Sequence, residues 1–265
     1  MKYKPSYNSL IFRSIRKIRF MLVFSTISLI GITLLSDIRI LKAGNEEFYI
    51  QRGIKKANKG DLENAILDYS RAIEINPNSA DAYYNRAYDK AKAGNLQGAI
   101  TDYSKVIELT PNDADAYFHR GNAKKILKRY RSSIIDYNKA IAIKAKYWNA
   151  YYNRGNAKLE LRQYLQSIED YNEVIAINPN YIDAYYNRGF AKSELKEYKG
   201  AINDYDKVIS LNSKYEEAYY NRGHIKTSLL DYKGAIKDFT KVIKLNPQHK
   251  NSYVNRGITK SMLSD

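Results

Sequence analysis

The sequence has 265 residues, a formal net charge of +16 at neutral pH and no cysteine. Without cysteine the chain can form no disulfide, no thiolate metal site and no cysteine-based catalytic centre. The positive charge is uneven, because residues 1–45 contribute +7 of it and residues 114–147 another +7. The net charge therefore does not indicate a nucleic-acid-binding surface along the whole chain.

The first predicted element is an apolar segment over residues 20–41, which follows a basic tail over residues 1–19. Phe20 to Leu35 is a run of sixteen uncharged residues, which as a helix spans about 24 Å, against roughly 30 Å for a hydrocarbon core. We expect an uncleaved membrane anchor. The alternatives are a signal sequence cleaved near Ala43, and a cytoplasmic chain whose apolar helix packs on the repeats that follow.

The charges that flank this segment predict its orientation. Six basic residues precede the uncharged run Phe20–Leu35 and two, Arg39 and Lys42, follow it closely. By the positive-inside rule the N-terminus is cytoplasmic and the rest of the chain is extracytoplasmic. If the segment is cleaved instead, the protein is secreted or periplasmic.

From residue 46 onward the sequence repeats with a period of 34 residues. The clearest copy of the repeated stretch is Ala150–Gly155, and near-copies begin at Phe48, Ala82, Ala116, Ala184, Ala218 and Ser252. Six full units occupy residues 46–79, 80–113, 114–147, 148–181, 182–215 and 216–249, and residues 250–265 supply a half repeat that we expect to cap the array. A fixed period of this length indicates a solenoid, so we expect one elongated array.

Each unit contains the pattern of two helices. In the second half of the second unit, Ala99, Ile100, Tyr103, Val106 and Ile107 form one apolar stripe at helical spacing. Position 8 of the repeat is mostly glycine and position 20 is alanine or serine. Because glycine weakens a helix, its recurrence predicts a close approach of the two helices. The fold class is therefore all-α, an α-solenoid with a hydrophobic helix at its N-terminus.

These features resemble the tetratricopeptide repeat family, whose 34-residue pattern combines an aromatic residue, Leu-Gly, Tyr, Ala, a second aromatic and Pro. The resemblance implies a right-handed superhelix. Two departures recur: position 7 is arginine, as in Arg154, and position 11 is lysine, as in Lys158. Both accompany an aspartate at position 23, as in Asp170. We predict that each such arginine pairs with the aspartate in the seam between the helices.

In this family the first helices line a concave groove through positions 2, 5, 6, 9, 12 and 13. Positions 2, 5, 9 and 12 also share one helical stripe. The resemblance thus implies a peptide-binding groove formed by Tyr84, Tyr88, Phe118, Asn122, Tyr152, Asn156, Tyr186, Phe190, Tyr220 and His224. Candidate groove hydrogen bonds come from Asn85, Asn153, Asn187 and Asn221; a hydrogen bond between repeats is the alternative for these amides. Positions 9, 12 and 13 vary most and are the better candidates for partner selection.

A basic cluster lies in the third unit at Lys124, Lys125, Lys128, Arg129 and Arg131. A solvated face is the simplest interpretation. Acidic lipid, an acidic protein or RNA are the other partners that such a patch could contact.

The sequence carries no pattern typical of an enzyme. His119, His224 and His249 occupy unequivalent repeat positions, and there is no phosphate-binding glycine loop. We therefore expect no catalytic residue, no metal site and no cofactor. The expected function is a non-catalytic scaffold that binds a protein or peptide partner, anchored in a membrane and involved in assembly of membrane or envelope complexes. A soluble or secreted adaptor and an RNA-binding array are the alternatives, nucleic acid being the less favoured partner.

Overall fold

The computed structural model describes residues 45–264, and all regular secondary structure in this range is helical, as predicted for an all-α chain. A first helix covers residues 45–57. It is followed by α2 (Leu62–Ile75), α3 (Ala80–Lys92), α4 (Leu96–Leu109), α5 (Ala114–Ile126), α6 (Tyr130–Ile143), α7 (Trp148–Glu160), α8 (Tyr164–Ile177), α9 (Ile182–Glu194), α10 (Tyr198–Leu211), α11 (Glu216–Ser228), α12 (Tyr232–Leu245) and α13 (Lys250–Ser264). The predicted basic tail and the apolar segment over residues 20–41 lie outside the described residues. Within residues 45–264, no helix combines the length and hydropathy that crossing a membrane requires.

The chain divides into two compact units between Asp89 and Lys90, inside α3, where the sequence predicted one array. The division therefore falls within the second repeat, near the end of its first helix, and not at a boundary between repeats. In the first unit the helix over residues 45–57, α2 and the start of α3 share a small apolar core of Ile50, Ala72 and Ala82.

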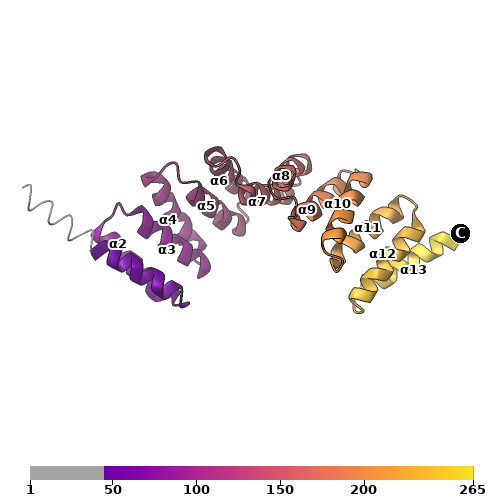
Figure 1. Ribbon diagram of the computed structural model, residues 1–265, viewed down its shortest axis with the longest axis horizontal. Helices are drawn as coiled ribbons and strands as arrows, with labels where there is room; N and C mark the ends of the chain where they lie inside the picture. The colour runs from indigo at the N-terminus through magenta and orange to yellow at the C-terminus, as the bar shows by residue number, and fades with distance from the viewer. Residues whose placement is uncertain (1–44, 265) are drawn as a thin grey trace, which may run out of the picture. The chain divides into compact units, whose positions relative to one another are not determined.

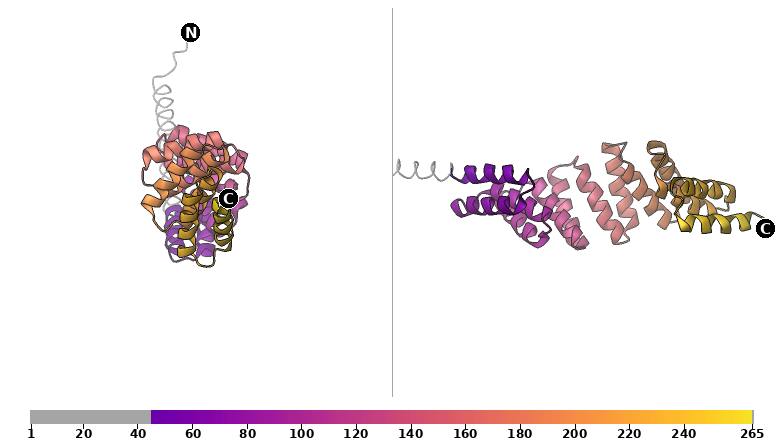
Figure 2. Two further views of the ribbon diagram at one scale, coloured as in Figure 1. Left: turned by 90° about the vertical axis from the view of Figure 1, so that its right-hand side faces the viewer. Right: turned by 90° about the horizontal axis from the view of Figure 1, so that it is seen from below.

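In the second unit the helices follow one another in chain order, each packed on the one before it (Figure 1). The view from below shows the same succession (Figure 2). The first helices of the repeats, α5, α7, α9 and α11, also contact one another, whereas consecutive second helices of this unit form no comparable contact. Because helices on the inside of a curved stack lie closer together, the first helices form the inner layer of this unit.

One aromatic ring fills the centre of each hairpin. These rings are the position 24 residues Tyr69, Tyr103, Tyr137, Tyr171, Tyr205 and Phe239, each at most 1% exposed. A Cβ atom added to Gly155 would lie 2.9 Å from Cε1 of Tyr171, and the same conflict recurs at Gly121 and Gly223. The close approach was predicted correctly. The group that requires it is the aromatic ring at position 24, not the small side chain at position 20.

The turns between paired helices contain a feature that the sequence did not predict. Position 15 has a positive φ in each hairpin, both where it is glycine, Gly60 and Gly94, and where it is not: Lys128, Arg162, Lys196 and Leu230 have φ between 57° and 63°. A residue with a side chain costs roughly 1–2 kcal/mol in this conformation. Packing of the hairpin therefore imposes the turn.

Candidate functional site

A buried carboxylate joins the two helices of each hairpin. Nη2 of Arg154 lies 2.6 Å from Oδ1 of Asp170, and Nζ of Lys158 lies 2.9 Å from Oδ2 of the same residue. The equivalent arginine, lysine and aspartate meet at Arg52, Lys56 and Asp68; Arg120, Lys124 and Asp136; Arg188, Lys192 and Asp204; and Arg222, Lys226 and Asp238. The predicted pairing of arginine with aspartate is confirmed, and lysine is a second partner that the sequence analysis did not assign.

The same arginine also reaches the preceding repeat. Nη1 of Arg154 donates to Oδ1 of Asn138 on α6 at 2.7 Å, and its guanidinium lies 5.2 Å from the ring centroid of Tyr151. Arg188 bonds Asn172 in the same way. The guanidinium groups of Arg154 and Arg188 therefore bond to residues of the two neighbouring helices, which leaves them few hydrogen-bond donors for a ligand.

On the inner layer, each aromatic ring at position 5 packs against the aromatic side chain at position 34 of its repeat. We call these residues the aromatic row: Phe118 with Tyr147, Tyr152 with Tyr181, Tyr186 with Tyr215, and Tyr220 with His249, at ring-centroid distances of 4.8–5.2 Å. Phe118 is only 8% exposed. Contrary to the prediction, its ring belongs to the core and not to an open groove. Tyr152, Tyr186 and Tyr220, like Tyr84 in the first unit, are half-buried.

Three of the four candidate asparagines form hydrogen bonds between repeats. Nδ2 of Asn187 donates to Oη of Tyr152 at 3.2 Å and to Oδ1 of Asn156 at 3.0 Å. Asn221 donates to Oη of Tyr186 at 3.1 Å. These contacts correspond to the alternative that the sequence left open. Asn153 likewise accepts a hydrogen bond from Nζ of Lys125 in the preceding repeat, whereas Asn85 donates to the carbonyl of Asp81 in its own helix.

The position 9 residues fall into two groups. Asn122 and Asn156 accept hydrogen bonds from the hydroxyls of Tyr137 and Tyr171, both at 2.8 Å. Their side-chain carbonyl oxygens therefore satisfy buried donors of the core. Tyr88, Phe190 and His224 are exposed, the first two at 42% and 37%. Although His224 is exposed as a residue, partial desolvation of its ring against Tyr220 and Phe239 lowers its pKa, which favours the neutral form.

A depression of about 340 Å³ lies on the inner layer where α5, α7 and α9 meet. Its lining residues are Lys125, Tyr130, Asn156, Leu159, Glu160 and Asn187. The hydroxyl of Tyr130 donates to Oε2 of Glu160 at 3.5 Å, and burial lowers the pKa of Lys125. The depression thus combines the aliphatic side chain of Leu159 and the ring of Tyr130 with an exposed carboxylate, one ammonium group and two side-chain amides.

Of the residues that line this depression, the sequence predicted only Asn156 and Asn187 as groove residues. Lys125, Leu159 and Glu160 occupy positions 12 and 13, whose variation was the available signal. Tyr130 starts a second helix, and nothing in the repeat pattern indicated that it would reach the first helices.

The five residues of the predicted basic cluster do not converge. Lys124 pairs with Asp136 inside the hairpin at 2.7 Å, while Lys125 lies on the inner layer. Nη1 of Arg129 donates to Gln97 at 2.9 Å. Lys128 and Arg131 are exposed.

Acidic side chains predominate on the inner layer of the second unit, although the chain as a whole is basic. The exposed acids on its first helices are Asp115, Glu160, Asp183, Glu194 and Glu217. They lie beside tyrosines: the hydroxyl of Tyr147 donates to Asp115 at 2.6 Å and that of Tyr164 to Glu194 at 3.1 Å. Burial, with Tyr152 and Asp183 nearby, raises the pKa of Tyr181 to about 12. Residues 45–264 contain no group of three His, Asp or Glu side chains placed to hold a metal ion.

Comparison with known proteins agrees with this arrangement. Family models described as TPR repeat or tetratricopeptide repeat match residues 57–91, 87–125, 160–196 and 192–229, together with 114–147 and 216–249. No curated protein matches the sequence.

Three solved structures illustrate the proteins whose fold is similar to that of this chain. A MamA protein is 26% identical, with a TM-score of 0.62, over 65% of this chain and 94% of its own. YrrB, described as a TPR protein with an unusual peptide-binding site, is 22% identical, with a TM-score of 0.65, over 71% of this chain and 97% of its own. The pilF protein of Pseudomonas aeruginosa is 18% identical, with a TM-score of 0.65, over 83% and 98%. Since the matched models cover more than half of its residues, the chain belongs to the tetratricopeptide repeat family.

Proposed function

We propose that the chain is a non-catalytic scaffold that binds a peptide segment of a partner protein along the inner layer of its second unit. The observation that carries the proposal is the depression beside Leu159, Glu160 and Asn156, which lies where consecutive first helices meet. Its volume is at the small end of the range for ligand sites, which suits a single peptide side chain. The description of YrrB as a peptide-binding protein supports this choice by analogy.

The charge of the inner layer indicates the chemistry of the peptide. Exposed carboxylates such as Glu160, Asp183 and Glu217 attract lysine and arginine, and nearby tyrosine rings add cation–π and apolar contacts. The exposed ring of Phe190 offers a further apolar contact. The partner segment is therefore basic with interspersed apolar residues. The same carboxylates repel phosphate groups, so RNA is not part of the proposal.

The proposed scaffold is anchored in a membrane, a placement that rests on the sequence alone. The apolar segment over residues 20–41 and the basic tail before it would hold the array outside the cytoplasm, where it would serve assembly of membrane or envelope complexes. A cleaved signal, giving a secreted or periplasmic adaptor, remains the alternative. A reporter enzyme that works only outside the cytoplasm, fused after Asp265, should be active; an expressed but silent fusion contradicts this placement.

Selection of peptides from a random display library on the purified chain tests the binding function. Selected peptides should be enriched in lysine or arginine next to apolar residues. Glu160→Lys and Phe190→Ala should each weaken their binding roughly tenfold, corresponding to about 1.4 kcal/mol. The control Ile135→Ala changes a side chain that is 61% exposed on the second helix α6 and should leave affinity unchanged. Peptides that bind all three variants equally would place the binding site elsewhere.

A further inference from the structure

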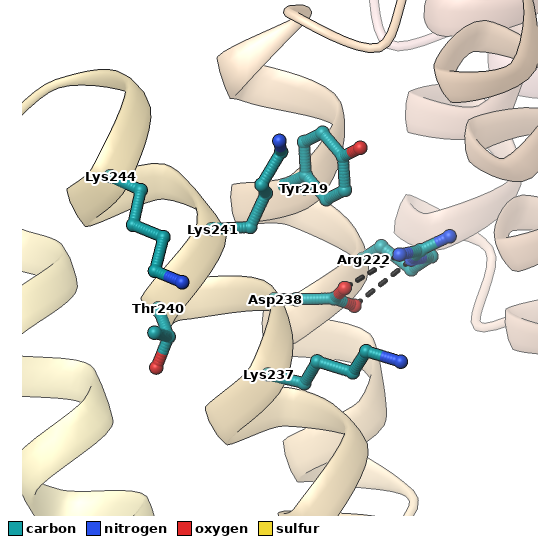
Figure 3. A pocket seen from close by; sticks show the side chains of 7 residues that line it. All are labelled: Tyr219, Arg222, Lys237, Asp238, Thr240, Lys241 and Lys244. Atoms are coloured by element: carbon teal, nitrogen blue, oxygen red, sulfur yellow. Dashed lines mark hydrogen bonds and ion pairs between the residues drawn. The ribbon is translucent and has the colours of Figure 1, made fainter.

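A second depression, of about 360 Å³, lies in the last full hairpin, on the side that carries the arginine–aspartate pair of α11 and α12. Figure 3 shows Tyr219 and Arg222 on one side, and Asp238, Thr240 and three lysines on the neighbouring helix α12. The lysines Lys237, Lys241 and Lys244 follow a spacing of four and three residues, which places them along one stripe of the helix. None of the residues proposed for peptide binding lines this depression.

The charges around this depression do not balance. Arg222 is neutralised by Asp238 and Asp206, and Lys226 also contacts Asp238. Among the described residues, Lys237, Lys241 and Lys244 form no ion pair; Lys241 only lies over the ring of Tyr219, with Nζ 5.9 Å from the centroid. The two aspartates are already paired, so three positive charges at the depression lack a counter-charge.

Packing does not require these lysines. The same three repeat positions hold Thr101, Lys105 and Glu108 in α4, Ile135, Lys139 and Ala142 in α6, Glu169, Glu173 and Ala176 in α8, and Asn203, Lys207 and Ser210 in α10. All four helices have 14 residues, as α12 does. In α4 the lysine is paired with the glutamate at 2.6 Å. Among the second helices of the described residues, α12 alone carries lysine at all three positions.

We infer that this depression binds a phosphate group, held by the ammonium groups of Lys237, Lys241 and Lys244. Ammonium groups are mobile point charges that suit the oxygens of phosphate, and charge-assisted hydrogen bonds are stronger than neutral ones. Because Arg222 and Lys226 already neutralise Asp238, the net charge at the depression is positive, and a positively charged surface concentrates anions. The phosphate belongs either to a free phosphate compound or to the headgroup of an anionic phospholipid.

The repeats themselves supply the test variant. Lys237→Glu, Lys241→Glu and Lys244→Ala together give α12 the residues that α8 carries at these positions, so the hairpin should still fold. The matched control is Lys139→Glu, Lys146→Glu and Lys199→Ala, which changes three exposed lysines elsewhere and alters the net charge by the same amount. Circular dichroism confirms that both variants remain helical.

Two measurements on the whole chain separate the sources of phosphate. Titration calorimetry with pyrophosphate at low salt tests a free compound. To test a headgroup, the chain is first inserted into phosphatidylcholine vesicles through residues 1–44. Its capture of a second set of vesicles, made with or without phosphatidylserine, is then measured by turbidity, so insertion of the apolar segment does not produce the signal. We expect the α12 variant to lose binding by roughly tenfold or more in at least one measurement, and the control by clearly less. Loss with pyrophosphate identifies a free phosphate compound, and loss with vesicles alone identifies a lipid. Equal losses in both variants, or no binding of either probe by the parent chain, overturn the inference.

Discussion

At the residue scale, the buried aspartates at position 23 fix how the two helices of each hairpin pair, because each carboxylate requires charged partners from the facing helix. A carboxylate taken out of water is costly unless partners replace its hydration. Asp170 has two such partners, since Arg154 and Lys158 each contact one of its oxygens, and its side chain is 2% exposed. The sequence revealed the arginine, because its period and that of the aspartate coincide. It did not assign the lysine, which on a helix surface could equally have pointed to solvent.

The second partner reduces the expected effect of removing the first. Arg154→Met should lower the free energy of unfolding by about 1–3 kcal/mol, because Lys158 still neutralises Asp170. Arg154→Met with Lys158→Met should lower it by about 3–5 kcal/mol, since the buried carboxylate is then unpaired. Urea denaturation measures both values. Lys139→Met, at an exposed position, is the control and should change stability by less than about 0.5 kcal/mol. A double variant no less stable than this control would show that the carboxylate is hydrated in solution.

The pH dependence of the first unit follows from Asp68. The hydrogen bond from Arg52, assisted by Lys56 and opposed by burial, lowers the pKa of this carboxyl to about 2 from an ordinary value of 3.8. A depressed folded-state pKa contributes stability that is complete above the unfolded-state pKa and is lost as the pH falls through the folded-state value. Here the contribution is complete above about pH 4 and disappears as the pH falls to about 2.

Asp68→Asn tests this window, because the amide cannot titrate. The parent chain should be more stable than the variant near neutral pH, and the difference in unfolding free energy should shrink as the pH falls from about 4 to about 2. Urea denaturation at a series of pH values measures this difference. A difference that does not change with pH would mean that Asp68 gains nothing from its charged partners.

At the element scale, the glycine at position 8 controls how closely paired helices approach. A methyl group at Gly155 would meet the ring of Tyr171 at 2.9 Å, whereas at Gly257 nothing lies within 4 Å. Gly155→Ala should therefore destabilise the chain by about 1–3 kcal/mol through overpacking, even though alanine favours the helix. Gly257→Ala should be neutral or should stabilise the chain by up to about 1 kcal/mol. Thermal denaturation compares the two, and an unchanged melting temperature for Gly155→Ala would show that the ring can move aside.

Helix positions and their pairing were predictable because the apolar stripe and the glycine at position 8 recur with the 34-residue period. The turns were not. A positive φ at position 15 is suggested by the sequence in two repeats, where the residue is glycine, Gly60 and Gly94. In the other four repeats the residue type gives no such indication: Lys128, Arg162, Lys196 and Leu230. The candidate site was predicted in part for a similar reason: repeat position places a residue on the inner layer, but hydrogen bonding decides whether its polar atoms remain open. Asn122 and Asn187 are on the predicted face, yet both bond to other side chains.

At the scale of the whole molecule, the second unit is stabilised by hydrogen bonds between the first helices of successive repeats. The amide of Asn187 bonds Tyr152, that of Asn221 bonds Tyr186, and that of Asn255 bonds Tyr220, so each first helix holds the one before it. In an array with only nearest-neighbour contacts, local stability depends on how many neighbours a helix has. The helix α7 packs on α5, α6, α8 and α9, whereas α13 packs on α12.

Hydrogen exchange should therefore be faster in α13 than in α7. In α13 only Ser252 and Thr259 are buried, and the apolar side chains of Val254 and Ile258 are at least half exposed. Asn255→Ala removes the hydrogen bond to Tyr220 at 3.1 Å and should speed exchange in α13 further, by about threefold to tenfold for a bond worth about 1 kcal/mol. Exchange in α7 should not change. The control Asn85→Ala removes an amide that bonds within its own helix, and should leave α13 as in the parent chain. Faster exchange throughout the unit in Asn255→Ala would instead mean that the second unit opens as one cooperative body.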